Sequence, residues 1–288
     1  MVEEADIVAS SKRPNGSFRA RGIQTLAQLA TALALPFVFV VIWWTLTDWL
    51  RLFDAGLIPG PFAVLHALAD WIFNIENRLY SGTWVEAVEG SSQRVMTGFV
   101  FGSAAGVVLG ILLGYFPRAA HFVEPSIHLL RSIPVISWLP LAFVFFGFGI
   151  TSAIVLVGVG VFFPVVINTM AGVRGVDRTM LRVGQMSGAS TFQILRWIIL
   201  PGAMPNIVTG LRVGIGIAWV LVIVAEWTAV RTGLGFVLLD AYGFIRIDFV
   251  MAAMISVGLM GFIFDRLIMY ATRPLIRWHL DTAGRAGA

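Results

Sequence analysis

Long stretches without a charged residue alternate with shorter polar segments along this chain. The first uncharged stretch covers residues 26–47 and the second covers residues 96–116. A helix needs about 20 predominantly apolar residues to cross the hydrocarbon core of a membrane, so each stretch is long enough to span it. We therefore predict a membrane-spanning helix at each place, and a short amphipathic helix over residues 62–73 between them.

The longest uncharged stretch, residues 132–173, is too long for one span. Its 42 residues would extend about 60 Å as a straight helix, which is twice the ~30 Å hydrocarbon core. We expect the chain to turn back, and the glycine-containing segment 147–152 is the natural turn. This predicts a third span over 135–146 and a fourth over 153–170.

Two further spans bring the predicted number to six. The fifth covers residues 207–225 and contains Arg212 near its inner end, and the sixth covers 249–270 with Asp265 and Arg266 near its inner end. We expect Arg212 to extend its long side chain to the membrane surface. Asp265 and Arg266 are expected to pair locally or with the backbone.

The distribution of Lys and Arg predicts the orientation. The predicted inner segments hold 13 of these residues, the outer segments hold 5, and 2 lie within spans. Membrane proteins carry an excess of Lys and Arg in their cytoplasmic segments. We therefore place the tails 1–25 and 273–288 in the cytoplasm, on either side of a membrane domain over 26–272. The loop 174–205, between the fourth and fifth spans, lies on the same cytoplasmic side.

Composition supports an all-α integral membrane protein. Hydrophobic residues make up 58% of the chain, charged residues 12%, and the mean hydropathy is +0.87. Soluble globular domains carry about 25% charged residues. The chain has no cysteine, which excludes disulfides and thiolate metal sites.

The sequence does not indicate catalytic chemistry. Its single lysine is Lys12, and no G-x-x-x-x-G-K-[ST] segment is present. Because that motif forms the phosphate cradle of many ATPases, ATP hydrolysis is expected on another subunit. The four histidines show no paired metal spacing, and no Ser/His/Asp or paired-carboxylate arrangement occurs. We predict no enzyme activity, no metal and no cofactor on this chain.

Five glycines recur every four residues in the second span. They are Gly98, Gly102, Gly106, Gly110 and Gly114. This spacing places them along one stripe of a helix, where small residues allow another backbone to approach closely. We interpret the stripe as a helix-packing surface rather than a glycine-lined ligand site.

The loop between the fourth and fifth spans has a pattern of its own. Residues 182–205 read as a helix, a break at residues 188–190, and a second helix over 191–200. Pro201 is expected to end this second helix, because proline lacks the N–H and clashes with the preceding turn. From this physical pattern alone, the segment could be a helix pair lying at the membrane surface with its arginines near lipid headgroups.

The same segment resembles the cytoplasmic coupling loop of permease subunits in binding-protein-dependent ABC importers. The resemblance lies in G-A-S-x-x-Q followed by L-P-G-A-x-P. The matching residues are Gly188, Ala189, Ser190, Gln193, Leu200, Pro201, Ala203 and Pro205. In that family the short helix after the glycine docks into a groove on a separate ATPase subunit. The family usually begins this loop with Glu-Ala-Ala, whereas this chain has Arg182, Val183 and Gly184 there.

The resemblance implies a fold, partners and a location. The fold is that of a type I ABC importer permease with six spans, and the chain would work as a homodimer in a bacterial inner membrane. Two ATP-binding subunits would carry ATP and Mg²⁺ on the cytoplasmic side. A soluble substrate-binding protein would deliver the solute from outside, and transport would proceed by alternating access.

A second segment, residues 232–254, is similar to permeases for nitrate, bicarbonate, sulfonates and taurine. The matching residues are Gly233, Gly235, Asp240, Ala241 and Asp248. This resemblance favours a sulfonate such as taurine, with nitrate or bicarbonate next.

Two acidic residues near the outer side are candidates for the transport pathway or its gate. Glu226 lies at the outer end of the fifth span and Asp240 in the segment that follows; the alternative for Glu226 is a hydrated position at the membrane interface. For the whole chain, the alternative is a stand-alone ion-coupled secondary transporter or a channel. The scarcity of acidic residues at mid-membrane argues against ion coupling.

Overall fold

The computed structural model describes residues 34–54, 56–77 and 79–286, and helices account for almost all of them. The chain divides into two compact units, residues 1–63 and residues 64–288. In the first unit, one apolar helix covers Ala34–Trp49, and its last turn, η1 (Thr45–Trp49), is a π-helix. The predicted first span over 26–47 is thus seen only from residue 34 onward, and its beginning lies outside the described residues.

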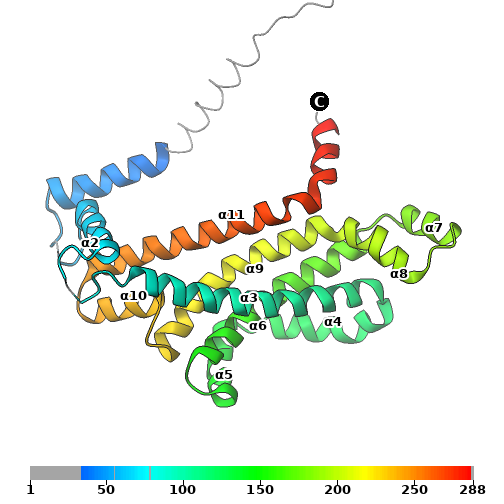
Figure 1. Cartoon of the computed structure of the whole chain (residues 1–288), viewed down its shortest axis with the longest axis horizontal. Coiled ribbons are helices and arrows are strands. Elements are labelled where there is room, and N and C mark those ends of the chain that lie inside the picture. Colours follow the sequence, from blue (N-terminus) through cyan, green and yellow to red (C-terminus); the bar gives the residue numbers. More distant parts are fainter. Residues whose placement is uncertain (1–33, 55, 78, 287–288) are drawn as a thin grey trace, which may run out of the picture. The chain divides into compact units, whose positions relative to one another are not determined.

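The second unit contains most of the helices, which Figure 1 shows along the chain. In order they are α2 (Pro61–Phe73, which begins at the end of the first unit), α3 (Trp84–Tyr115), α4 (Pro117–Arg131), η2 (Val135–Trp138), α5 (Leu139–Phe146), α6 (Ile150–Arg174), α7 (Arg178–Met186), α8 (Thr191–Ile194), η3 (Leu195–Ile199), α9 (Leu200–Ala229), α10 (Leu234–Gly243) and α11 (Ile247–Ala286).

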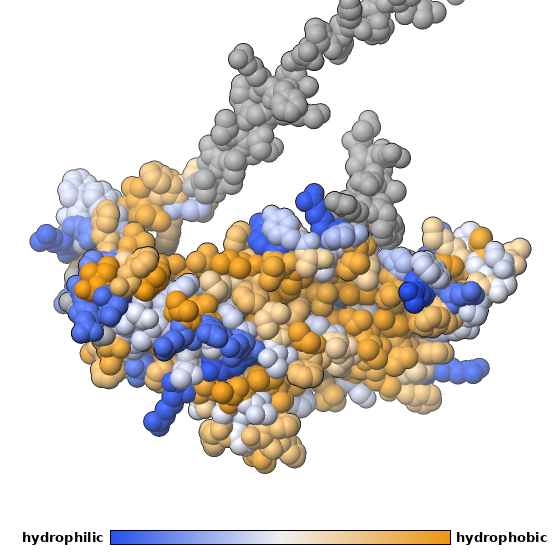
Figure 2. Space-filling view, in the orientation of Figure 1, coloured by the Kyte–Doolittle hydropathy of each residue, from blue (hydrophilic) through white to orange (hydrophobic). Residues whose placement is uncertain are grey.

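Helix α6 is the centre of this unit. It packs along much of its length against α3 on one side and α9 on another, and α11 packs against α9. Residues Leu156, Val157, Val161 and Val165 of α6 are fully buried. Figure 2 shows that hydrophobic residues cover much of the visible surface of these long helices. This is the expected surface for helices whose outer faces meet lipid tails rather than water.

The glycine stripe of α3 is where α6 comes closest. A Cβ placed on Gly98 would lie 2.7 Å from the carbonyl oxygen of Ile154, and one on Gly110 would lie 2.6 Å from Cβ of Thr169. At Gly102, a Cβ would collide with the carbonyl oxygen of Gly158. Any side chain on this stripe would therefore push the two helices apart.

The predicted third span differs from the structure. Residues 135–146 form the short turn η2 followed by α5, which has only 8 residues. Together with α4 they make a pair bent by 96°, which is apolar enough for a membrane but has the shape of a broken span or a re-entrant loop. Pro134 precedes η2 and Pro140 lies in the first turn of α5. Because proline removes a backbone donor and restricts the residue before it, a straight helix does not form through this stretch.

Four helices of the described part are long and apolar enough to span a membrane by themselves: Trp84–Tyr115, Ile150–Arg174, Thr191–Ala229 and Ile247–Ile276. The turn predicted at 147–152 is shorter in the structure: residues 147–149 separate α5 from α6, and Gly147 adopts a φ of 75° there, whereas residues 150–152 belong to α6. The all-helical membrane architecture is thus confirmed, whereas the number of six spans stays a prediction.

Candidate functional site

The loop between α6 and α9 begins with a capped helix. The carboxylate of Asp177 accepts a hydrogen bond of 2.7 Å from the backbone N–H of Thr179, at the start of α7. This bond satisfies one of the donors that a helix start leaves unpaired. It also holds the pKa of the Asp177 carboxyl below its ordinary value, because the charged form is the better acceptor.

Helix α7 ends at Met186, and a tight turn follows. Gly188 adopts a φ of 75°, a left-handed conformation that glycine reaches without the steric cost paid by other residues. Its N–H donates to the carbonyl of Gln185, and the N–H of Ala189 donates to that of Gly184. The break predicted at residues 188–190 therefore lies where the structure has its turn.

The next helix, α8, starts with a reciprocal cap. The backbone N–H of Gln193 donates to the hydroxyl of Ser190 at 3.3 Å, and the backbone N–H of Ser190 donates to the side-chain oxygen of Gln193 at 2.7 Å. This arrangement is a capping box, which fixes where a helix begins. Ser190 and Gln193 thus have a local structural role within the predicted coupling motif.

The prediction that Pro201 ends the second helix is wrong. The chain stays helical from Thr191 to Ala229, with the π-turn η3 immediately before α9. In this turn the N–H of Leu200 donates to the carbonyl of Leu195, five residues earlier. Such a wide turn rearranges the hydrogen bonds just before the proline, and Pro201 then sits in the first turn of α9, where a proline is tolerated.

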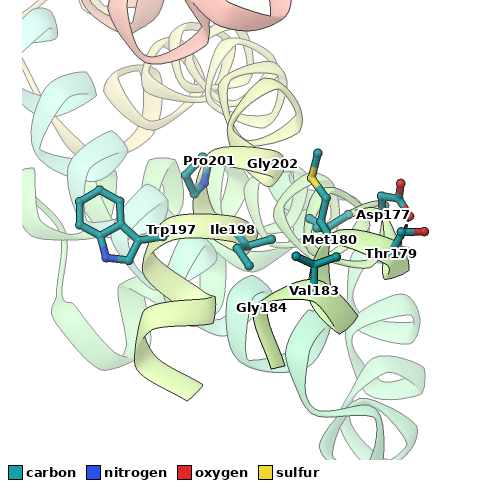
Figure 3. A pocket seen from close by; sticks show the side chains of 11 residues that line it. Asp177, Thr179, Met180, Val183, Gly184, Trp197, Ile198, Pro201 and Gly202 are labelled. Carbon is teal, nitrogen blue, oxygen red and sulfur yellow. Dashed lines mark hydrogen bonds between the residues drawn. The ribbon is translucent and has the colours of Figure 1, made fainter. Parts of the chain in front are cut away.

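A cavity of about 800 Å³ lies between α7 and the start of α9. Figure 3 shows Ile198 and Val183 at its centre and Trp197 at one side. The side chain of Met180 is 61% exposed and that of Trp197 is 71% exposed. The exposed apolar residues beside the cavity and at the turn that follows α7 are Met180, Val183, Met186, Phe192 and Trp197. We call them the α7–α8 surface.

The residues of the coupling motif differ in how exposed they are. Arg182, Gly188, Ser190 and Gln193 are exposed. Gly184 is buried, as is Ala203, and Ala189, Leu200, Pro201 and Pro205 are half-buried. A Cβ on Gly184 would approach Cδ1 of Ile198 to 2.7 Å. Gly184 therefore allows α7 to pack against the helix that leads into α9.

Glu226 is not hydrated at the interface. Only 1% of its surface is exposed, and its Oε1 lies 2.6 Å from Nη1 of Arg94 on α3. Its carboxylate also accepts hydrogen bonds from the hydroxyl of Ser91 and the N–H of Gly235. Arg94 itself lies within α3 and is only 5% exposed.

Asp240 lies near this buried pair but in a more open place. Its Oδ2 accepts a hydrogen bond of 2.7 Å from the hydroxyl of Tyr80, which joins α10 to the segment before α3. Burial, together with the hydrogen bond and the charge of Asp240, raises the pKa of Tyr80. Both side chains line a cavity of about 450 Å³, along with Glu86, Thr232 and Phe236.

The ionisable residues of the fifth and sixth predicted spans pair with each other, not locally. Arg212 on α9 donates from Nε and Nη2 to the two carboxylate oxygens of Asp265 on α11, at 2.8 and 2.9 Å. The guanidinium of Arg266 instead lies 4.8 Å from the ring centre of Phe262. Helical spacing alone could not have shown the Arg212–Asp265 pair, because the partners are on different helices.

Comparison with known sequences assigns the family. The sequence pattern of the family described as "binding-protein-dependent transport system inner membrane component" matches residues 106–276, from the middle of α3 to α11. That range is more than half of the chain and includes the whole α7–α8 surface. The chain belongs to this family of ABC transport permeases.

Relatives of the permease match most of its length. A protein of Methanocaldococcus jannaschii named as an ABC transporter permease is 36% identical over 87% of this chain and 92% of its own. The taurine transport system permease protein of Escherichia coli is 32% identical over 88% of this chain and 90% of its own. The nitrate import permease protein of Synechocystis is 32% identical, with coverage of 81% and 84%.

Solved structures agree on the fold. A chain of the MetNI methionine ABC transporter, in an inward-facing conformation, superposes with a TM-score of 0.52 at 22% identity. The match covers 66% of the permease and 96% of the other chain. It supports the type I importer architecture expected from the sequence.

Proposed function

We propose that this permease subunit belongs to an ATP-driven importer of a small anionic or zwitterionic solute. A sulfonate such as taurine is favoured, and nitrate or bicarbonate comes next. Support comes from the relatives, which are named for taurine and nitrate transport. The protein would be a multi-pass component of a bacterial inner membrane with both termini in the cytoplasm.

Its partners follow from the importer scheme. Two ATP-binding subunits would hold ATP and Mg²⁺ and dock on the cytoplasmic side, and this chain would contribute no cofactor. An extracytoplasmic substrate-binding protein would deliver the solute. Two copies of the permease would form the pathway between them and switch by rigid-body motion between outward-facing and inward-facing states.

The observation that carries this proposal is the α7–α8 surface. It exposes Met186 and Phe192 on either side of the turn at Gly188, and Met180 and Trp197 beside the cavity. Exposed apolar patches next to polar residues are typical of protein interaction sites. The ATP-binding subunit is the partner that the importer scheme places there.

The continuous helix from Thr191 to Ala229 suggests how movement passes into the membrane. A rigid helix has a fixed rise per residue and transmits displacement along its axis. When the ATP-binding subunits move α8, the same helix would move α9 within the bundle. A helix that ended at Pro201 would interrupt this connection. The π-turn η3 instead keeps the backbone helical up to the start of α9.

The test is co-purification followed by an ATPase measurement. The permease would be purified from detergent-solubilised membranes, and ATPase activity measured with binding proteins loaded with taurine, alkanesulfonates, nitrate or bicarbonate. We expect an ATPase to co-purify and one loaded binding protein to stimulate it. If the chain purifies alone and transports without nucleotide, the importer proposal fails, and a stand-alone carrier or channel takes its place.

A further inference from the structure

The ion pair between Arg212 and Asp265 lies within the predicted membrane region, towards its inner end. Arg212 is five residues after the start of the predicted fifth span at 207, and Asp265 is five residues before the end of the predicted sixth span at 270. Each therefore lies about 8 Å inside the inner end of its span. Ionisable residues within membrane spans are costly and usually serve a function.

This pair is more exposed than the ion pair between Arg94 and Glu226. The side chains of Arg212 and Asp265 are 44% and 30% exposed, whereas those of Arg94 and Glu226 are 6% and 0% exposed. An ion pair whose only role is to join two helices could be buried in the same way as Arg94 and Glu226. The surface in front of Arg212 and Asp265 is accessible instead.

The face of α9 beside this pair is polar and open at its inner half. Thr209, three residues before Arg212, is exposed and lies on the same side of the helix. One turn further out, a Cβ on Gly216 would meet no atom within 4 Å. Charged and polar side chains at this depth face a water-filled cavity or other protein rather than lipid.

We propose that Arg212 and Asp265 form a transit contact for a solute that carries both an oxyanion and an ammonium group, such as an aminosulfonate. The inference rests on the proposed importer function and narrows its substrate class. The guanidinium of Arg212 would bind the sulfonate oxygens through its planar set of donors. The carboxylate of Asp265 would accept hydrogen bonds from the ammonium group.

The charges explain why a zwitterion fits this site better than a simple anion. When a zwitterion enters, each charged side chain exchanges its partner for an oppositely charged group of the solute, so no charge is left unpaired. A simple anion would satisfy Arg212 but leave the charge of Asp265 without its partner, which is less favourable than keeping both charges paired. The contact therefore favours solutes that carry both charges.

The test is a binding measurement without ATP and without the binding protein. The permease and its co-purified ATPase would be placed in lipid nanodiscs, and ligand-observed saturation-transfer NMR would be recorded with taurine and with ethanesulfonate, which lacks the amine. We expect binding of taurine and much weaker binding of ethanesulfonate. Asp265→Asn and Arg212→Gln should each weaken taurine binding about tenfold or more, as expected for loss of a charge-assisted contact.

The chain provides a matched control pair. Arg174 and Glu124 form a similar two-bond contact at 3.1 and 2.8 Å, with side chains that are 41% and 27% exposed. Arg174→Gln should leave taurine binding unchanged. Basal ATPase activity of every variant reports whether the complex is still assembled.

The outcomes separate this inference from the proposed function. If taurine does not bind the wild-type complex, or if Asp265→Asn weakens taurine and ethanesulfonate binding equally, the inference is wrong even when uptake is normal. The inference would also be wrong if Arg174→Gln weakened taurine binding as much as Asp265→Asn does. Failure of ATP-dependent uptake with every loaded binding protein would instead defeat the proposed function.

Discussion

The guanidinium of Arg94 and the carboxylate of Glu226 form an ion pair of 2.6 Å that joins α3 to α9. Arg94 also donates to the carbonyl and the hydroxyl of Thr232, and Glu226 accepts the N–H of Gly235. The pair therefore holds the start of α10 against two long helices. This makes it a structural centre of the end of the bundle at which α3 begins and α9 ends.

Replacing one partner should destabilise the permease strongly. Glu226→Gln leaves the Arg94 charge buried without compensation, and such changes cost about 3–5 kcal/mol. The free energy of unfolding in mixed detergent micelles would measure the loss. Asp248→Asn is the control, because its pair with Arg246 is 26% and 30% exposed and exposed pairs contribute about 1 kcal/mol or less. Equal losses in both variants would contradict the structural role of Glu226.

The glycine stripe of α3 should tolerate no added methyl group at Gly102, where α6 comes closest. Gly102→Ala would place Cβ against the backbone oxygen of Gly158, which no side-chain rotation can relieve. Overpacking of this kind costs about 1–3 kcal/mol, and the melting temperature of the purified protein should fall.

A glycine outside the stripe should instead gain stability when it is replaced by alanine. Gly258 lies within α11, and a Cβ there would meet no atom within 4 Å. Because alanine favours helix over glycine, Gly258→Ala should stabilise by roughly 0.5–1 kcal/mol. If both alanine variants melt at the same temperature, close packing does not explain the stripe.

Gly188 should be needed for coupling rather than for folding. Its φ of 75° disfavours residues with a Cβ by about 1–2 kcal/mol, but asparagine tolerates this conformation. We expect Gly188→Arg to abolish uptake into membrane vesicles while the protein remains folded, because the large side chain would stand between the α7–α8 surface and its partner. Gly188→Asn should retain most of the uptake. Normal uptake by Gly188→Arg would show that this turn does not contact the ATP-binding subunit.

Local patterns in the sequence were enough to predict several of these features. The four-residue spacing of Gly102 and its neighbours predicts the helix-packing stripe, and α6 packs closely against it in the structure. The break predicted at Gly188 is a turn in the structure. The prediction that Pro201 ends the second helix is wrong because the π-turn η3 lets the helix continue. Such a turn depends on the hydrogen bonds of several neighbouring residues, which the position of one proline does not reveal. The partners Arg94 and Glu226 are separated by 132 residues, and hydropathy gives the period of a helix but not which helix packs against it.

The cap of α7 should respond to pH through Asp177. Its pKa is lowered in the folded protein from an ordinary value of 3.8, so the carboxylate stabilises the folded state above that value, and the contribution is lost as pH falls through the lowered pKa. Asp177→Asn keeps a capping side chain that does not titrate. The difference in melting temperature between wild type and Asp177→Asn should therefore be constant from pH 7 to about pH 5 and shrink at lower pH. A difference that stays constant down to pH 2.5 would show that the charge of Asp177 does not contribute to this cap.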